Sequence, residues 1–344
     1  MDPKLYERYS RQILFADIGE EGQKRLLQSS VVLVGCGALG TVSVGLLLRA
    51  GVGSLRIVDR DFVEMSNLQR QGLFEESDAQ ESLPKAVAAE RRLRAINSDA
   101  KIEGLVSDLT PKNARELLTG FSLILDGTDN FESRLLINDA AISLKIPWIY
   151  AAAVGSYGLT FTVRPEATAC LACLAETGDG SQGDGFEETC DTAGILNGAA
   201  SVVASIQATE AIKILSGNSA ALSERLVSCD VWKNRFQSIG VARNPSCRAC
   251  ALHKFTYLEG EAQPHVTMCG RDSVQIHERS RRLDLAELSR RLERSSVGVR
   301  SNDFLLRFQI PPYEVTVFSD GRAVVKGTQD PAVARSLYAR YVGA

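Results

Sequence analysis

The chain has 344 residues, of which 44% are hydrophobic and 24% charged, and its formal net charge is −3. This length accommodates one large domain and a smaller one, and a pI near 5.8 leaves no electrostatic footprint for nucleic acid. Because the sequence shows no apolar stretch of membrane-spanning length and no charged-then-apolar signal segment, it predicts a cytoplasmic protein without membrane insertion.

The first predicted segment, residues 1–29, is a polar arm that precedes the first strand. It contains the sequence RYSRQI at residues 8–13, which buries little surface by itself. We therefore expect the arm to lean on another part of the molecule. For Arg11 on this arm, an ordinary solvated surface arginine is the alternative to a functional role.

The glycine-rich turn that follows is typical of a nucleotide site. A buried parallel strand is predicted at residues 31–34, a helix at 39–50 and a second strand at 54–58. Small residues between the first strand and the helix let the backbone approach a phosphate, and the helix N-terminus presents free N–H groups to it. The acid after the second strand lies where such folds bind ribose. The predicted nucleotide ligands of this unit are Gly35, Gly37, Ala38, Gly40 and Asp59.

The polar segment after Asp59 argues against a simple dinucleotide oxidoreductase. Asp61, Asn67, Gln69 and Arg70 follow within a dozen positions. One acid suffices to bind ribose, whereas a polar cluster that ends in arginine is better matched to a triphosphate, whose charge must be neutralised before a nucleophile approaches. The segment therefore favours ATP.

Two later segments bring further charged residues. Lys85 lies in the first turn of a helix predicted at residues 83–96, where its charge opposes the helix dipole unless a bound polyphosphate compensates it. A strand at residues 122–125 ends at Asp126-Gly127-Thr128-Asp129-Asn130, before a helix at 131–144. Carboxylates at the carboxyl end of a parallel strand lie where open α/β sheets bind ligands, although Asp129 would also serve as a helix N-cap.

Two pairs of cysteines predict a structural zinc site. The ligands would be Cys170, Cys173, Cys247 and Cys250. Four thiolates complete a closed tetrahedral Zn²⁺ site, and a redox C-x-x-C motif would not need the second pair. Elements predicted around these pairs are strands at residues 147–152, 159–163, 226–231 and 235–241 and a small-residue helix at 197–215.

Residues 176–190, rich in glycine and acids, predict an exposed loop that ends at Cys190. A reactive cysteine needs a depressed pKa, which a sequence does not reveal, so Cys190 is either a nucleophile or an incidental thiol. After residue 264 the chain changes character and predicts a β-α-β-β-β-α module. Its strands are expected at residues 274–276, 305–310, 314–318 and 322–325, and its helices at 283–292 and 331–341.

Several of these motifs together resemble the ThiF/MoeB family of adenylyltransferases, relatives of the ubiquitin-activating enzymes. They are RYSRQI, VDRDFVEMSNLQRQ at residues 58–71, Pro84-Lys85 and the Asp126–Asn130 run. The resemblance extends from about Tyr6 to Leu258. It implies a Rossmann-like α/β fold at residues 1–260, with an arm (1–29), a nucleotide-binding core (30–150) and a zinc-tied carrier-binding part (151–260). The module at residues 265–344 is an α+β appendage of unknown role.

The resemblance also implies roles for single residues. Arg11 would reach the ATP of the partner subunit in a homodimer, and Arg70 and Lys85 would bind phosphate. Asp129 would hold Mg²⁺ beside Asn130, with Asp126 as the alternative magnesium ligand. In ThiF-type members a cysteine that resembles Cys190 forms an acyl disulfide with the carrier.

The function implied is ATP-dependent adenylation of the C-terminal glycine of a ubiquitin-like sulfur carrier protein that ends in Gly-Gly. Because no rhodanese domain is present, a separate sulfur donor is expected. Three alternatives stay open: an activating enzyme for a protein-conjugating modifier, a nicotinamide oxidoreductase, and a non-catalytic scaffold. The oxidoreductase leaves the SNLQR segment and the cysteine pairs without a role.

Overall fold

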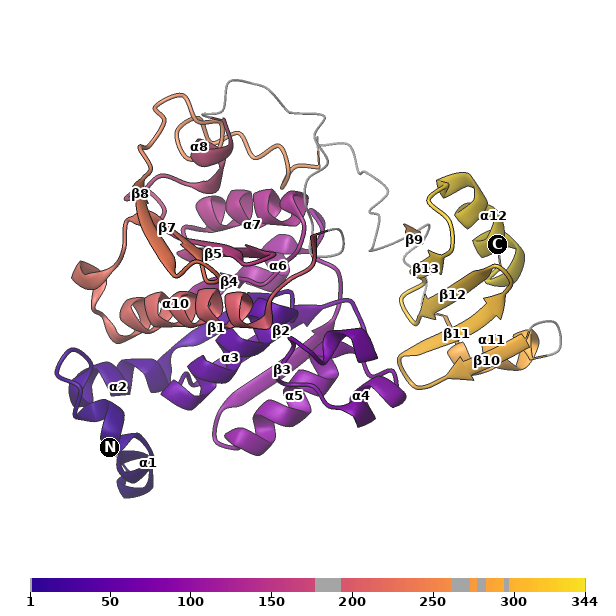
Figure 1. The fold of residues 1–344 in the computed structure, drawn as a ribbon, viewed down its shortest axis with the longest axis horizontal. Coiled ribbons are helices and arrows are strands. Elements are labelled where there is room, and N and C mark those ends of the chain that lie inside the picture. Colours follow the sequence, from indigo (N-terminus) through magenta and orange to yellow (C-terminus); the bar gives the residue numbers. More distant parts are fainter. Residues whose placement is uncertain (1, 177–192, 261–272, 277–282, 294–296, 344) are drawn as a thin grey trace. The chain divides into compact units, whose positions relative to one another are not determined.

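The computed structural model describes residues 2–176, 193–260, 273–276, 283–293 and 297–343 (Figure 1). The chain forms two compact units, Met1–Ala262 and Gln263–Ala344. Each unit has its own sheet and its own buried core.

The first unit is built on a mixed sheet of eight strands in the order β3-β2-β1-β4-β5-β6-β7-β8. Its first five strands run parallel, and the last three are antiparallel to their neighbours. The strands are β1 (Ser30–Val34), β2 (Ser54–Asp59), β3 (Lys101–Val106), β4 (Leu123–Asp126), β5 (Trp148–Val154), β6 (Tyr157–Val163), β7 (Arg225–Asp230) and β8 (Arg235–Gly240). The order reverses between β1 and β4, which creates the switch point where open α/β sheets bind ligands.

Helices cover both faces of this sheet (Figure 1). They are α1 (Pro3–Ile13), α2 (Gly19–Gln28), α3 (Ala38–Ala50), α4 (Glu76–Gln80), α5 (Lys85–Ile96), α6 (Ala114–Leu118), α7 (Phe131–Leu144), α8 (Leu171–Glu176) and α10 (Asn197–Ser216), with short 3₁₀ turns at Met65–Asn67 (η1) and Ser219–Ala221 (η2). Val32 and Val34 of β1 pack with α6 and α7, whereas Val31 and Leu33 pack with α3, α5 and α10. The strand is therefore buried on both faces, which explains its uninterrupted apolar sequence. No helix of the described residues is long and apolar enough to span a bilayer.

The arm is more ordered than its polar sequence suggested. Residues 2–28 form α1 and α2, which the sequence did not predict as helices. Tyr9 of α1 is buried and accepts a hydrogen bond from Nδ2 of Asn97 at 3.3 Å, and Arg8 donates to the Ile96 carbonyl at 2.6 Å. The arm thus leans on the end of α5, as expected.

The second unit is a five-stranded antiparallel sheet in the order β10-β11-β12-β13-β9. Its elements are β9 (Ser273–Ile276), α11 (Leu285–Leu292), β10 (Val297–Ser301), β11 (Leu305–Ile310), β12 (Tyr313–Phe318), β13 (Ala323–Lys326) and α12 (Pro331–Tyr341). Both helices contribute to one core with the sheet, through Leu288 and Tyr338 against Phe308 and Val317. The predicted β-α-β-β-β-α pattern lacked β10 and was wrong in that respect. The strand is irregular in register, and glycine at position 298 weakens its alternating pattern.

Candidate functional site

The glycines of the nucleotide turn have separate structural causes. Gly35 has φ of 85°, and a Cβ there would lie 2.6 Å from the Gly127 carbonyl oxygen, so two turns meet at this point. A Cβ on Gly40 would lie 2.3 Å from the Gly35 carbonyl oxygen, because α3 packs closely on β1. At Gly37, the residue that caps α3, the nearest atom to an added Cβ is 3.8 Å away. Gly35 and Gly40 thus serve packing, whereas Gly37 has room for a Cβ and lies, like the neighbouring Ala38, partly exposed at the helix N-terminus.

Asp59 ends β2 and ties this turn to the next segment. Its Oδ2 accepts from the Cys36 N–H at 2.6 Å and its Oδ1 from the Asp61 N–H at 2.7 Å. The side chain is buried, and this burial raises the pKa of Asp59 to about 6, with Asp61 adding to the effect and Lys85 and the two backbone N–H groups opposing it.

Lys85 is a buried cation among acids. Its backbone N–H donates to the Asp61 carbonyl at 2.8 Å, and its Nζ lies 3.2 Å from Oδ2 of Asp61. Burial alone would lower the pKa of Lys85, but Asp61, Asp59 and Asp129 together raise it. A fixed ammonium at the carboxyl ends of the strands is suited to binding an anion such as a phosphate.

The segment after Asp61 forms η1, and its polar side chains are used in different ways. Oδ1 of the buried Asn67 accepts from the Glu64 N–H at 3.0 Å, in a capping box that shapes the segment. Gln69 is exposed. Arg70 is partly exposed and donates from Nη1 to the Ser66 carbonyl at 2.9 Å, which anchors the guanidinium by one corner.

The turn after β4 separates the roles of its two acids. Asp126 is fully buried, its Oδ1 accepts from the N–H and hydroxyl of Thr128 at 2.9 and 2.7 Å, and its Oδ2 lies 3.3 Å from Nε of Arg134. Burial raises the pKa of Asp126, and Arg134 and Thr128 oppose the rise. Its oxygens are therefore engaged within the protein, which disfavours it as a metal ligand.

Asp129 is the exposed acid of this turn. The N-cap of α7 is Asn130, whose side chain accepts from the Ser133 N–H at 2.8 Å, so the interpretation of Asp129 as the cap is wrong. Asn130 also approaches Oδ1 of Asp129 at 3.5 Å. Asp129 thus remains exposed while contributing to the pKa of Lys85.

Of the two remaining predicted catalytic residues, Arg11 and Cys190, the structure describes Arg11, which does not join this cluster. Arg11 is exposed on α1, and among the described residues no ion pair links it to Lys85, Asp61 or Asp129. Cys190 lies outside the described residues.

The four paired cysteines converge in a second site. Cys170, Cys173, Cys247 and Cys250 are buried, and their sulfur atoms all lie within 4.8 Å of one another. Individual separations are 3.9 Å for Cys170–Cys173, 3.7 Å for Cys170–Cys247 and 3.4 Å for Cys173–Cys250. A disulfide would need about 2.05 Å. Sulfurs bound tetrahedrally at about 2.3 Å from one zinc ion lie about 3.8 Å apart, so the donor set fits Zn²⁺.

Neighbouring groups hold this cysteine cluster in place. The Asn244 N–H donates to Sγ of Cys173 at 3.4 Å, and Nδ2 of Asn138 to Sγ of Cys170 at 3.7 Å. Next to Asn138, the buried Asp139 accepts from Nη1 of Arg248 at 2.9 and 3.0 Å. Donors to the sulfurs and a fixed second cysteine loop are the outer contacts expected around a thiolate metal site.

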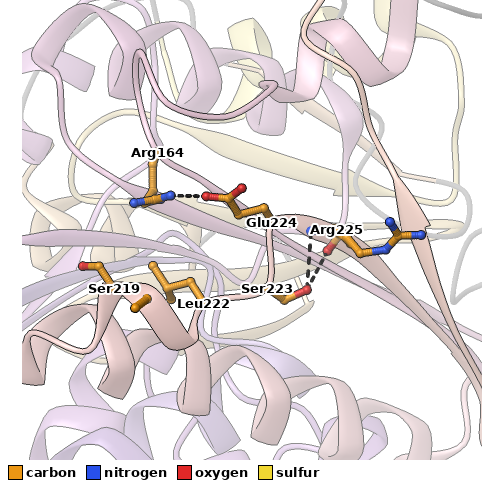
Figure 2. A pocket seen from close by; sticks show the side chains of 7 residues that line it. Arg164, Ser219, Leu222, Ser223, Glu224 and Arg225 are labelled. Atoms are coloured by element: carbon orange, nitrogen blue, oxygen red, sulfur yellow. Dashed lines mark hydrogen bonds and ion pairs between the residues drawn. The ribbon is translucent and has the colours of Figure 1, made fainter.

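A hollow of about 680 Å³ lies elsewhere, lined by Arg164, Ser219, Ala220, Leu222, Ser223, Glu224 and Arg225. The hollow lies just after the carboxyl end of β6. Because this end of β6 pairs with the start of β5, the hollow lies toward the amino ends of the parallel strands, whereas Lys85 lies at their carboxyl ends. Figure 2 shows Arg164 and Glu224 facing each other as an ion pair. Because these charges already neutralise each other, we assign the hollow no ligand.

Comparison with known proteins gives a consistent result. A family model described as the ThiF family matches residues 9–249. The chain is 46% identical over 340 residues to the sulfur carrier protein ThiS adenylyltransferase of Bacillus subtilis, which covers 98% of this chain and 99% of that protein. It is 36% identical over 251 residues to the protein of the same name from Escherichia coli. That alignment covers 73% of this chain and 97% of the relative.

Among solved structures, Escherichia coli MccB with ATP matches with a TM-score of 0.61 at 22% identity, over 71% of this chain and 74% of that chain. This likeness shows a shared fold. The α/β class expected from the sequence is therefore confirmed by the topology and by this neighbour.

Proposed function

Because the chain belongs to the ThiF family, we propose that it is an adenylyltransferase that activates the C-terminal glycine of a ubiquitin-like sulfur carrier of the ThiS type. The proposal is supported by the name of the Bacillus subtilis relative, whose alignment covers nearly the whole of both chains. The structural observation that carries it is the buried Lys85 at the carboxyl ends of the strands, held by Asp61 and close enough to Asp129 to be influenced electrostatically.

The reaction joins a carboxylate to AMP. A carboxylate oxygen of the carrier attacks the α-phosphorus of ATP, the bond from this phosphorus to the bridging oxygen breaks, and pyrophosphate leaves. Lys85 and Arg70 neutralise phosphate oxygens, while Asp59 binds the ribose and the Gly37–Ala38 turn offers backbone N–H groups. Gly35 and Gly40 allow this turn to form. Such transfer needs positive charge more than proton shuttling, which suits this residue set.

Asp129 is the residue that we propose to hold Mg²⁺, with Asn130 beside it in the nucleotide site. Asp129 is exposed and acidic, and hard divalent cations of this kind prefer one or two carboxylates together with phosphate oxygens and water. When bound, the ion neutralises charge on the phosphate oxygens. Asn67 and Gln69 complete the proposed nucleotide site, Asn67 by shaping η1 and Gln69 through its exposed amide.

The remaining parts of the proposal concern Zn²⁺ and the partners. The four paired cysteines hold a structural zinc ion, supported by the sulfur separations. Arg11 acts on the ATP of the partner subunit in a homodimer, supported by its exposure on an arm that also exposes Leu14 and Phe15. A separate donor supplies sulfur, and Cys190 is a candidate acceptor of the activated carrier.

Carrier-dependent exchange of pyrophosphate into ATP tests the function. The wild-type protein should catalyse it with a ThiS-type carrier that ends in Gly-Gly, and a carrier that lacks the last glycine should not support it. Asp129→Ala should lower the rate about 10²–10³-fold, the usual loss when one charge-stabilising group is removed. Glu116→Ala, an exposed acid on α6, is the control. An unchanged rate in Asp129→Ala would refute the role of Asp129, and absence of exchange in the wild type would refute the function.

A further inference from the structure

We propose that Gln207 of α10 is a positioning residue that fixes the turn carrying Asp129. The idea rests on the proposed function, because it concerns the catalytic role given to Asp129. Gln207 is fully buried in a helix composed mainly of small and apolar residues, and nothing in the sequence pattern singles it out.

The side chain of Gln207 makes three hydrogen bonds. Its Nε2 donates to the Asp126 carbonyl at 2.8 Å and to the Ile149 carbonyl at 2.9 Å. Its Oε1 accepts from the hydroxyl of the buried Ser43 at 2.6 Å. One amide thus joins α10, α3, β4 and β5, and α10 and α3 lie side by side on this face of the sheet (Figure 1).

The two carbonyl groups lie where β4 and β5 part. Their pairing ends at Leu125 and Ile149, whereas on the other side β4 continues to pair with β1 through Asp126. Beyond this point Gln207 donates to the carbonyls that a neighbouring strand would otherwise satisfy. An unsatisfied buried carbonyl is costly, so the amide determines how far the strands separate.

The turn between this point and Asp129 has little freedom. Thr128 is held on one side by Oδ1 of Asp126, which accepts from its N–H and hydroxyl, and on the other by Nη2 of Arg134, which donates to its carbonyl at 2.7 Å. A shift of Asp126 therefore passes directly to Thr128 and to the next residue. Gln207 fixes the backbone of Asp126, and the contacts of Thr128 pass this constraint on to Asp129.

The test is Gln207→Leu, which keeps most of the side-chain volume and removes all three hydrogen bonds. We expect the carrier-dependent exchange rate at saturating substrates to fall at least tenfold, and the Mg²⁺ concentration for half-maximal rate to rise at least fivefold. Affinity for a non-hydrolysable ATP analogue, measured without Mg²⁺, should change less than threefold. A loss confined to stability would leave the rate of the folded protein and its Mg²⁺ requirement unchanged.

Glu210→Leu is the matched control. Glu210 is buried one turn further along α10, and its carboxylate accepts from Lys213, from the Ser223 N–H and from the Thr162 hydroxyl of β6, which pairs with β5 on the side away from β4. This variant should lose comparable stability but keep its rate and Mg²⁺ requirement within threefold. If both variants behave alike, Gln207 has no positioning role.

Ser43→Ala covers the case in which Gln207→Leu does not fold. It removes the bond to Oε1 of Gln207 together with the longer contact of the same hydroxyl to the Ala204 carbonyl at 3.3 Å, and it should raise the Mg²⁺ requirement two- to fivefold; an unchanged requirement would overturn the proposal. Because wild-type exchange is measured first, failure of the adenylation itself is distinguishable from failure of this inference.

Discussion

Asp59 is the residue whose protonation couples the nucleotide turn to folding. Its pKa is about 6 in the folded protein against an ordinary value of 3.8. As pH rises from about 4 to 6, the unfolded chain releases this proton first, so ionisation of Asp59 costs the folded state stability across that window. The stability that the protonated Asp59 carboxyl contributes is fully present below the unfolded-state pKa of 3.8 and is lost above the folded-state pKa of about 6.

Asp59→Asn should remove this dependence. We expect the free energy of unfolding of the wild type, minus that of the variant, to fall by about 2–3 kcal/mol between pH 4 and pH 7, since one pKa unit corresponds to about 1.4 kcal/mol. Urea denaturation at several pH values measures the difference, in which contributions from other acids such as Asp126 cancel. A difference that stays constant with pH would contradict the environment described for Asp59.

At the same scale, the sequence grouped the residues of the turn after β4 but did not separate their structural roles. It listed Asp126, Asp129 and Asn130 as a group but left the helix cap and the metal ligand open. The choice depends on which oxygen accepts from Ser133 and on the burial of Asp126, and neither is encoded in local spacing. Gln207 was missed because its partners lie 58 and 81 positions away along the chain.

At the scale of elements, the packing of α3 on β1 predicts different outcomes for two glycines of one helix. Gly40→Ala would place a methyl group 2.3 Å from the Gly35 carbonyl oxygen and should destabilise the protein by about 1–3 kcal/mol or more. Gly45→Ala meets only a Leu73 methyl at 4.0 Å and should be neutral or stabilise by up to about 1 kcal/mol, because alanine favours helices.

Thermal unfolding of both variants measures this contrast. Equal melting temperatures would show that α3 does not approach the turn as closely as described. Gly40→Ala should also weaken nucleotide binding, since the displaced helix carries Ala38 at its N-terminus.

Elements with strong periodic or apolar patterns were predicted well, and those shaped by tertiary contacts were not. The helices at residues 131–144 and 331–341 are confirmed with the expected limits, and the predicted strand at 31–34 falls within β1. The helices α1 and α2 were missed because their sequences are dominated by polar residues, and α1 buries only Tyr9. The start of α5 at Lys85 instead of residue 83 reflects Pro84, which has extended backbone and precedes the helix.

At the scale of the whole molecule, the cysteine cluster joins segments that lie far apart in sequence. Cys170 and Cys173 follow β6, and Cys247 and Cys250 follow β8. We expect one zinc ion per chain. Its removal by a strong chelator should lower the melting temperature by more than 10 °C, because a structural zinc ion contributes folding free energy on the order of 10 kcal/mol.

Metal analysis of two serine variants tests the assignment. Cys247→Ser should lose zinc and stability together, whereas Cys229→Ser, a buried cysteine outside the cluster, should keep the metal. Zinc-free protein of unchanged stability would exclude a structural metal.

The match to the ThiF family model ends before the second unit begins, whereas the similarity to the Bacillus subtilis relative extends through it. The ThiF model matches residues 9–249, while the Bacillus subtilis relative aligns over 98% of the chain. The second unit has its own core of apolar side chains from two helices and five strands. Its independent core explains why the pattern of its sequence was recognisable without any motif for a site.

The pairing of Lys85 with Asp61 has a consequence for which form of nucleotide enters. Three carboxylates influence the Lys85 ammonium, so this group already has counter-ions when no nucleotide is bound. A nucleotide without a bound cation would have to displace these carboxylates, which repel its phosphate groups. A nucleotide that arrives with its own divalent cation instead permits an exchange of partners, in which the acids turn to the cation and the ammonium to the phosphates. If the nucleotide binds at Lys85 as proposed, this arrangement would favour the cation-complexed nucleotide over the free one before any chemistry begins.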